Sequence, residues 1–170
     1  MAGANRTLPL IVVMCTGNMC RSPMAEALFR HHLRKKGLCA EVISRGLAAP
    51  VGRKPHPYAV EVALENGVPL PEDKRAAAIT APELAAATVV FVMDAGHRRE
   101  VQKRFPTATG KTFLLGQWGV GEIADPINSP REAFEAAWKD LDSSVQTWLE
   151  HLHAAGLIPA SSGACDRNLM

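Results

Sequence analysis

LIVVMCTGNMCRSPMAE, residues 10–26, joins an apolar run to a small polar loop and then to a helical pattern. The run at residues 10–14 is short, apolar and rich in β-branched side chains, which is typical of a buried strand. Ser22 is a good N-cap residue, Pro23 suits the first helical position, and Gly37 offers a helix stop. The stretch therefore predicts a strand, a tight loop and a helix, with the loop ending at the helix N-terminus.

The rest of the chain alternates between strand-like and helix-like patterns. We expect further strands at residues 40–44, 88–93 and 111–115, and further helices at residues 56–66, 95–104 and 129–156. Ser129 and Glu132 have the spacing of a capping box at the start of the last helix. Such alternation is typical of a parallel sheet covered on both faces, so we predict an α/β fold, a doubly wound three-layer sandwich with a four-stranded parallel sheet.

Length and composition limit the possible classes of protein. The chain has 170 residues, enough for one domain with a substantial core, which we expect to span residues 1–158. Residues 159–170 are small and polar, and we expect a disordered tail there. The net charge of +2 gives no argument for nucleic-acid or membrane binding, and no apolar run approaches the length of a transmembrane helix. We expect a monomer or a weak dimer.

Cys15 and Arg21 flank the loop between the first strand and the first helix, and this arrangement suits a bound phosphate. Loop amides and the helix N-terminus favour an anion, and Arg21 can add a two-pronged guanidinium clamp. The same field favours the thiolate form of Cys15, which would attack phosphorus in line and form a phosphocysteine intermediate. The Ser22 hydroxyl is placed to hydrogen-bond that sulfur and make it a better leaving group.

Two other interpretations of the same residues remain open from the residues alone. Cys15 could be an inert small apolar residue at a strand end, with Arg21 on the surface. Cys15 and Cys20 could also be metal ligands together with His31 or His32, although the lack of a second cysteine pair argues against such a site. We therefore expect no metal and no cofactor, and we place both histidines at solvated helix positions.

Residues 13–26 closely resemble the signature of the low-molecular-weight protein tyrosine phosphatases, in which a Cys-x5-Arg-Ser loop near the N-terminus precedes proline and a helix. The resemblance covers about residues 9–155, with Ser44-Arg45-Gly46 and Met93-Asp94 at further family positions. It implies the strand order 2-1-3-4. It also implies that the phosphate is bound by Thr16, Gly17, Asn18, Met19, Cys20 and Arg21.

Asp125-Pro126, about a hundred residues after the loop, matches the general acid of the family. An aspartate before proline is equally common as a turn former, so the residues alone leave both interpretations open. Expelling a phenolate from phosphorus is slow without a proton donor. The resemblance implies that Asp125 protonates the departing oxygen and later deprotonates the attacking water. It further implies that the chain hydrolyses phosphotyrosine in a phosphorylated protein, with phosphate or another oxyanion held in the loop.

Two more loop residues have expected roles. Asn18 tolerates the left-handed backbone conformation and can hold the loop in shape through its side chain. Cys20 could be a packing residue beneath the loop, or it could trap oxidised Cys15 as a disulfide before over-oxidation, as the resemblance implies for part of the family. Because a thiolate nucleophile needs a reducing compartment and four cysteines suggest no disulfide framework, we expect the protein in the cytoplasm.

The expected substrate pocket, formed by Met19, Ile127 and Asn128, departs from the family pattern. Many relatives have aromatic residues directly after Asp-Pro, where this chain has Ile127 and Asn128. Phosphotyrosine-directed relatives tend to carry an aliphatic residue at the position of Met19, whereas a phosphoarginine-hydrolysing branch carries threonine. Met19 is apolar and favours an aromatic ring over a guanidinium. We therefore place phosphotyrosine first and phosphoarginine second.

Two further hypotheses belong to other classes. A thiol-based arsenate reductase uses the same fold but needs a pair of resolving cysteines well downstream of the nucleophile, whereas Cys39 and Cys165 lie far apart in the sequence. A phosphate-responsive binding module with a dead site is the non-enzymatic hypothesis. The presence of a nucleophile, a clamp and an acid argues against it.

Overall fold

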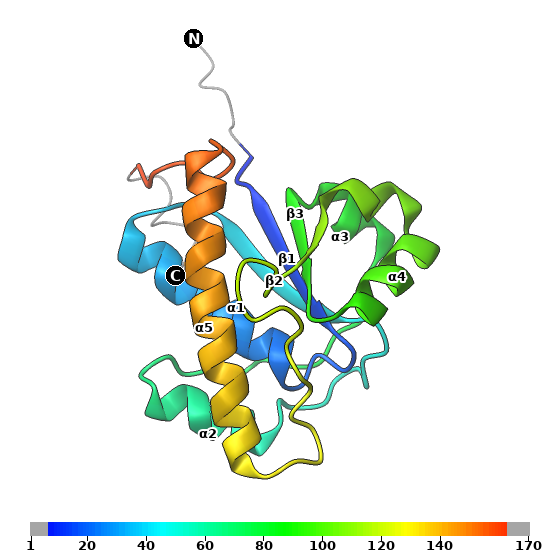
Figure 1. The fold of residues 1–170 in the computed structure, drawn as a ribbon, viewed down its shortest axis with the longest axis vertical. Coiled ribbons are helices and arrows are strands. Elements are labelled where there is room, and N and C mark those ends of the chain that lie inside the picture. The colour runs from blue at the N-terminus through cyan, green and yellow to red at the C-terminus, as the bar shows by residue number, and fades with distance from the viewer. Residues whose placement is uncertain (1–6, 163–170) are drawn as a thin grey trace.

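A four-stranded parallel sheet lies between two layers of helices in the computed structural model, which describes residues 7–162 (Figure 1). The strands are β1 (Leu10–Cys15), β2 (Glu41–Gly46), β3 (Val89–Val92) and β4 (Thr112–Leu114). The helices are α1 (Arg21–Lys36), α2 (Pro57–Glu65), α3 (Ala81–Ala86), α4 (Ala95–Arg104), α5 (Arg131–Ala154) and the short 3-10 helix η1 (Pro106–Lys111). The sheet order is β2-β1-β3-β4, so the predicted fold class and strand order are confirmed.

The alternation of side chains along β1 explains why this strand is apolar on both faces. Ile11 and Val13 pack into the core under α1 and α5, whereas Val12 and Met14 pack into a second core with residues of α3 and α4. All four side chains have no exposed surface. Successive residues of a strand point to opposite faces, so a strand in the middle of a three-layer fold needs apolar residues at every position.

The helices divide between the two faces of the sheet. Figure 1 shows α1, α2 and α5 on one side and α3 and α4 on the other. A side-chain hydrogen bond links α1 to α5, because His32 Nε2 lies 2.6 Å from Asp142 Oδ1. His32 is buried, so its predicted solvated position is wrong; the opposing helix covers it. Helix α3 was not predicted, although Thr80 and Glu83 form a complete capping box at its start.

Two helices start one or two residues away from the predicted positions, and neither start has a side-chain cap. Helix α1 begins at Arg21, and its N-cap Cys20 makes no side-chain capping bond, while Ser22 lies inside the first turn. Helix α5 begins at Arg131 with no side-chain cap, and the predicted capping box is absent. Ser129 instead donates its N–H to the carbonyl of Pro126 in the preceding turn.

The predicted stop of α1 at Gly37 is confirmed. Gly37 adopts a left-handed conformation with φ 63°, and its N–H donates to the Arg34 carbonyl. Such a conformation is accessible to glycine without a steric penalty. Strand β2 begins at Glu41, and its parallel register with β1 places Gly46 beside Cys15.

The end of the described chain folds back on the loop after α1. The Cys39 N–H donates to the Pro159 carbonyl, and the Ser161 N–H donates to the Gly37 carbonyl. Residues 163–170 of the predicted tail lie outside the described residues. Cys39 is disulfide-bonded, which the sequence analysis did not predict, whereas Cys15 and Cys20 are free thiols.

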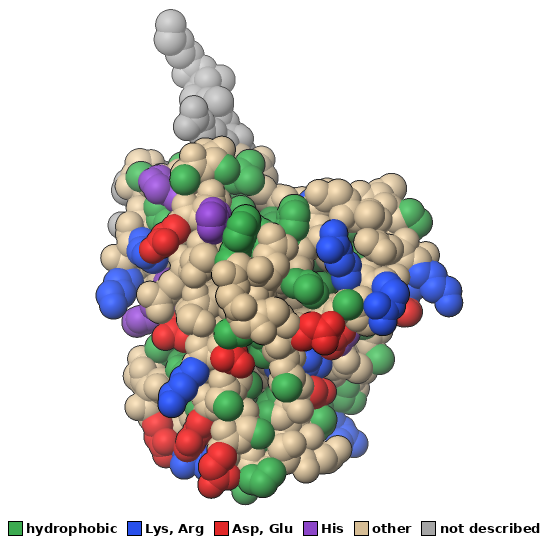
Figure 2. Space-filling model, viewed as in Figure 1, with side chains coloured by type: hydrophobic (Ala, Val, Ile, Leu, Met, Phe, Trp, Pro, Cys, Tyr) green, Lys and Arg blue, Asp and Glu red, His purple; other side chains and the backbone are tan. Residues whose placement is uncertain are grey.

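Charged side chains of both signs are interspersed on the face of the molecule shown in Figure 2, with apolar side chains between them. Within residues 7–162, none of the helices combines the length and the apolar character needed to cross a bilayer. The same residues contain no group of three or more His, Cys, Asp and Glu side chains placed to share a metal ion.

Candidate active site

The loop at residues 16–20 connects the carboxyl end of β1 to the N-terminus of α1. Cys15, the last residue of β1, pairs with Gly46 at the end of β2. A Cβ atom at Gly46 would lie 2.7 Å from the Thr16 carbonyl oxygen and 3.2 Å from the Asn18 Cβ. Only glycine lets the two strand ends approach this closely, so Gly46 fixes β2 against the loop.

The Cys15 sulfur is held by two polar groups of the loop. The Asn18 N–H donates to the sulfur at 3.2 Å, and the Ser22 hydroxyl oxygen lies 3.0 Å from it. The Ser22 oxygen also accepts a bond from Asn18 Nδ2 at 2.8 Å, so its own hydrogen can be donated to the sulfur or to the more distant Arg45 carbonyl at 3.5 Å. Both groups can therefore stabilise negative charge on Cys15.

Asn18 organises the loop. Its backbone is left-handed, with φ 54°, as predicted for this residue. Its side chain is fully buried and makes three hydrogen bonds, because Nδ2 donates to Ser22 and to Ser44 while Oδ1 accepts the Ala77 N–H at 3.0 Å. One side chain thus ties the loop to β2 and to the segment before α3.

The hydrogen-bond network continues beyond Ser44 to a buried carboxylate. The Ser44 hydroxyl accepts from Asn18 Nδ2 at 3.0 Å and lies 3.2 Å from Glu26 Oε2 as a donor. Glu26 is ion-paired with Arg30 and Lys74. An ionised carboxylate accepts hydrogen bonds only, so Glu26 orients the Ser44 hydroxyl toward itself. Burial lowers the pKa of Lys74, although the Glu26 charge opposes this shift.

Several backbone N–H groups of the loop are available to an anion. Within residues 7–162, the N–H groups of Gly17, Met19 and Cys20 make no hydrogen bond. The loop also ends at the first turn of α1, where the helix dipole adds positive potential. The loop therefore offers donors and a field that suit a phosphate-sized oxyanion.

Arg21 is buried beside this loop with one nitrogen left over. Its Nη1 donates to the Ile123 carbonyl at 2.8 Å and lies 3.5 Å from Asp94 Oδ2, while Nη2 lies 3.4 Å from Asp125 Oδ2. Its Nε is buried and has no hydrogen-bond partner. Buried donors in proteins are nearly always hydrogen-bonded, and an oxyanion held in the loop would supply a partner for this nitrogen.

Asp125 lies on an exposed loop and is brought to the same site. Its Oδ1 accepts the Ile127 N–H at 3.1 Å, a turn that fixes the carboxylate, and its Oδ2 faces Arg21. Its side chain is 40% exposed, so it remains accessible to a substrate and to water. The two interpretations of Asp125 as turn former and as acid are compatible, because one oxygen forms the turn while the other faces the site.

Asp94 and His97 complete the site, and sequence analysis assigned them no role. Asp94 caps α4 by accepting the His97 N–H at 2.8 Å. His97 Nε2 lies 2.8 Å from Thr16 Oγ1, and Nδ1 accepts the Met93 N–H. Burial lowers the pKa of His97, which favours a neutral ring that donates from Nε2 to Thr16. Burial works to raise the pKa of Asp94, but the hydrogen bond from the His97 N–H and the positive charge of Arg21 hold it low.

Cys20 is buried beneath the loop. Burial raises the pKa of its thiol to about 12, and the negative charges of Asp125 and Cys15 add to this effect. Cys20 therefore remains a neutral thiol near pH 7, whereas a second nucleophile would have to be a thiolate.

The expected substrate pocket contains apolar and turn residues. Met19 is partly buried and packs against the core, and its carbonyl accepts the His56 N–H at 2.9 Å. Ile127 is 41% exposed, and Asn128 adopts a left-handed conformation with φ 61° in the turn after Asp125. The turn that fixes Asp125 thus also presents Ile127 to solvent.

A thiol under two hydrogen-bond donors, a buried guanidinium with a spare nitrogen and an accessible carboxylate are the groups needed for transfer of a phosphoryl group through sulfur. Residues 10–156 match the sequence profile of the family described as low molecular weight phosphotyrosine protein phosphatase. The chain belongs to this family. The resemblance noted in the sequence is thereby confirmed.

Relatives of this phosphatase include enzymes of two kinds. The probable low molecular weight protein-tyrosine-phosphatase EpsP of Ralstonia nicotianae is 38% identical over 146 residues, which cover 86% of this chain and 97% of the relative. The solved arginine phosphatase YwlE of Geobacillus stearothermophilus is 35% identical with a TM-score of 0.78, covering 88% of this chain and 96% of that one. The tyrosine phosphatase Wzb of Escherichia coli K30, solved in complex with sulphate, is 33% identical with a TM-score of 0.79, covering 86% and 99%.

Replacing Asn18 by alanine tests the role of this residue in the phosphatase loop. The substitution removes one hydrogen bond each from Ser22, Ser44 and the Ala77 N–H and places alanine in a left-handed conformation. We expect a loss of about 2–4 kcal/mol in the free energy of unfolding, measured by denaturant titration. Turnover of an aryl phosphate should fall by about 10- to 100-fold, because the sulfur and the amides lose their relative positions.

Asn128→Ala is the matched control, since Asn128 is also left-handed but is exposed on its turn. Its free energy of unfolding should fall only by the cost of placing alanine in a left-handed conformation, about 1 kcal/mol. Equal stability losses in the two variants would show that the buried hydrogen bonds of Asn18 contribute nothing.

Proposed function

We propose that the protein is a metal-independent protein-tyrosine phosphatase that works through a phosphocysteine at Cys15. Two observations carry the proposal: the Nε of Arg21 is buried without a partner, and the Cys15 sulfur, at the other end of the same loop, has two hydrogen-bond donors. A phosphoryl group placed there would accept from Arg21 and from the free loop amides. The clamp, the nucleophile and the acid would then surround one phosphorus atom.

The first half of the proposed reaction transfers the phosphoryl group to sulfur. The Cys15 thiolate attacks phosphorus, the sulfur–phosphorus bond forms, and the bond from phosphorus to the tyrosine oxygen breaks. Asp125 delivers its proton to that oxygen, so the product leaves as neutral tyrosine. Arg21 and the loop amides bind the equatorial oxygens, where negative charge is concentrated in the transition state.

The second half regenerates the enzyme. Water attacks phosphorus, Asp125 takes the proton of the water, and the sulfur–phosphorus bond breaks to release inorganic phosphate. The leaving group is the Cys15 thiolate, and the Ser22 hydroxyl and the Asn18 N–H stabilise it as it forms. These two hydrogen bonds therefore act in both steps.

The substrate side of the proposal rests on Met19 and Ile127. Both offer apolar surface at the mouth of the loop, which suits a phenyl ring better than a guanidinium that needs polar partners. Phosphoarginine is the second candidate, because a curated relative of Geobacillus stearothermophilus, 36% identical over 145 residues, is named a protein-arginine-phosphatase.

We further propose that the substrate is a phosphorylated protein and that residues 1–158 form the catalytic unit. A cytoplasmic location suits the unprotected thiol of Cys15. When a peroxide oxidises Cys15 to a sulfenic acid, the Cys20 sulfur attacks the Cys15 sulfur, the sulfur–oxygen bond breaks, and a disulfide and water form. The protonated thiol of Cys20 makes this step slow unless a base assists it.

A kinetic comparison on three peptides tests the proposal, with one sequence carrying phosphotyrosine, phosphoarginine or phosphoserine. We expect the highest kcat/KM on phosphotyrosine. In the Met19→Thr variant, the ratio of kcat/KM on phosphoarginine to that on phosphotyrosine should rise by about tenfold, since one polar-for-apolar change in a pocket is worth 1–3 kcal/mol.

Met19→Leu is the matched control and should keep the original ratio. A higher kcat/KM on phosphoarginine in the unchanged protein would overturn the substrate assignment and leave the phosphocysteine mechanism standing. Absence of turnover on all three peptides, with vanadate still bound, would favour a binding module.

A further inference from the structure

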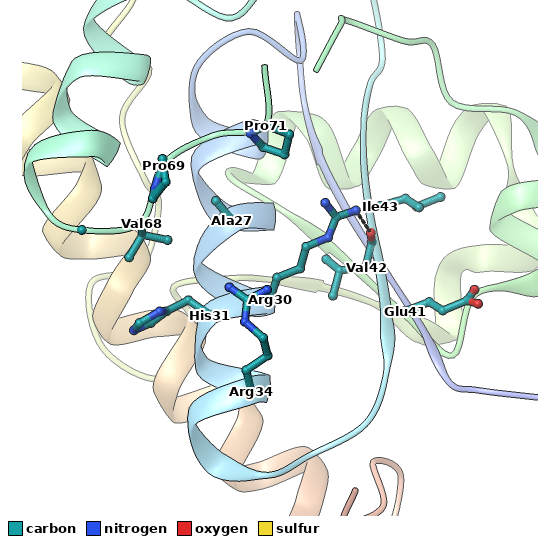
Figure 3. Close-up of a pocket in the computed structure, with 11 residues that line it drawn as sticks. Ala27, Arg30, His31, Arg34, Glu41, Val42, Ile43, Val68, Pro69 and Pro71 are labelled. Atoms are coloured by element: carbon teal, nitrogen blue, oxygen red, sulfur yellow. Dashed lines mark hydrogen bonds between the residues drawn. The ribbon is translucent and has the colours of Figure 1, made fainter. Parts of the chain in front are cut away.

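A second pocket lies outside the phosphate loop, between α1, β2 and the segment after α2. Its volume is about 500 Å³, within the range of small-molecule sites. None of residues 15–22 lines it, and neither Asp94 nor Asp125 does. Figure 3 shows Arg30, His31 and Arg34 of α1 on one wall and Val68, Pro69 and Pro71 on the neighbouring segment.

The walls of this pocket combine apolar surface with cations. Ala27, Val42 and Val68 line the pocket with little exposed surface, and the exposed rings of Pro69 and Pro71 add apolar surface. Arg30 and Arg34 lie one helical turn apart, so their side chains share one face of α1. Apolar walls with a few charged groups are typical of sites that bind a small organic molecule.

The two arginines differ in how they are held. Arg30 Nη2 donates to the Val42 carbonyl at 2.9 Å and to Glu26 at 3.1 Å, so this side chain is fixed in place. The Arg34 side chain, by contrast, makes no hydrogen bond or ion pair with any residue in the described range 7–162. Arg34 is therefore a guanidinium whose donors are all available to a ligand.

Basic side chains outnumber acidic ones in the lining of this pocket. His31 lines it, and burial followed by the charges of His32, Lys35 and Arg34 lowers the pKa of His31. One acidic residue, Glu41, belongs to the lining, and Figure 3 shows its carboxylate directed away from the two arginines. An anion placed beside Arg34 would thus meet cations without facing that carboxylate directly.

We propose that this pocket binds a small organic anion. The phosphoryl or carboxylate headgroup pairs with the guanidinium of Arg34, and the apolar body lies on Val68, Pro69 and Pro71. Arg30 lends positive charge but stays on Glu26 and the Val42 carbonyl. The site is distinct from the phosphate loop and does not depend on the reaction proposed above.

Amide chemical shifts of the full-length protein test the site, with vanadate first added to fill the phosphate loop. The probes are phenylphosphonate, benzoate and the uncharged benzyl alcohol, which compare two headgroups with none. We expect at least one of the two anions to shift the amides of Ala27, Val42 and Val68 saturably, and the stronger binder identifies the headgroup. The Arg34→Gln variant should bind that anion about tenfold more weakly, as the loss of a charge-assisted pair predicts.

Lys35→Gln is the matched control because it removes the same charge from the next residue of α1, which does not line the pocket. It should weaken binding of the anion far less than Arg34→Gln does, because Lys35 does not line the pocket and acts only through its more distant charge. Arg30 is left intact because its loss would also disturb Glu26. The proposal is overturned if neither anion shifts these amides, if benzyl alcohol binds equally well, or if Arg34→Gln and Lys35→Gln weaken binding to the same extent.

Discussion

Replacing Cys15 by serine should reduce the turnover of an aryl phosphate by about 10⁴-fold or more while the protein still binds vanadate or phosphate. The serine hydroxyl is protonated near neutral pH, whereas the thiolate is the reactive form of cysteine. The oxyanion donors are untouched, because Arg21 and the loop amides do not depend on sulfur. Binding and chemistry should therefore separate in this variant.

Two measurements decide this prediction. Turnover is followed with an aryl phosphate, and oxyanion binding is followed by the rise in melting temperature that phosphate causes. Cys20→Ser is the comparison, since it makes the same chemical change in the same loop and retains the proposed nucleophile; its turnover should stay far above that of Cys15→Ser. Near-normal turnover in Cys15→Ser would remove Cys15 from the nucleophile role.

The part of the molecule that could be predicted from sequence is the part with local signals. Three features depend only on residues close together in the sequence: the apolar run of β1, the glycine at the end of α1 and the alternation of strands with helices. The left-handed conformation of Asn18 belongs to the same class, because side-chain chemistry at one position favours it. These signals are enough to place the loop at the carboxyl end of β1.

What could not be predicted depends on contacts between distant segments. His97 lies 81 positions from Thr16 in the sequence, and only the pairing of β1 with β3 brings α4 beside the loop. In the sequence, Glu26 resembles an ordinary acidic residue of a first helical turn. In the structure it is buried, accepts a hydrogen bond from Ser44 and forms ion pairs with Arg30 and Lys74. No local pattern in the sequence predicts the contact of His97 with Thr16 or the burial of Glu26.

Competition between local and long-range partners explains the errors at the helix starts. Serine is a favoured N-cap residue, but the Ser22 hydroxyl is hydrogen-bonded to the Cys15 sulfur and to the Asn18 side chain. A cap contributes about 1 kcal/mol, which other hydrogen bonds of the same hydroxyl can replace. Functional sites are where local preferences are expected to fail, because the side chains there serve another purpose.

Asp125→Asn is the second variant with a large expected effect, and the effect should depend on the leaving group. Asparagine keeps the shape of the side chain and can still accept the Ile127 N–H, but it has no acidic proton to give. General acid catalysis contributes about 10²–10⁴-fold. We expect a loss of kcat/KM in that range for phenyl phosphate and a much smaller loss for p-nitrophenyl phosphate, whose anion leaves without help.

The measured quantity should be kcat/KM across a series of aryl phosphates, because it includes only the steps up to formation of the phosphocysteine. Asp94→Asn is the control: Asp94 lies 3.5 Å from Arg21, much as Asp125 does at 3.4 Å, but Asp94 caps α4. Loss of Asp94 should weaken the hold on Arg21 and reduce kcat/KM by a similar factor for every leaving group. A similar, uniform loss in Asp125→Asn would mean that both carboxylates merely position the guanidinium, and that the proton comes from elsewhere.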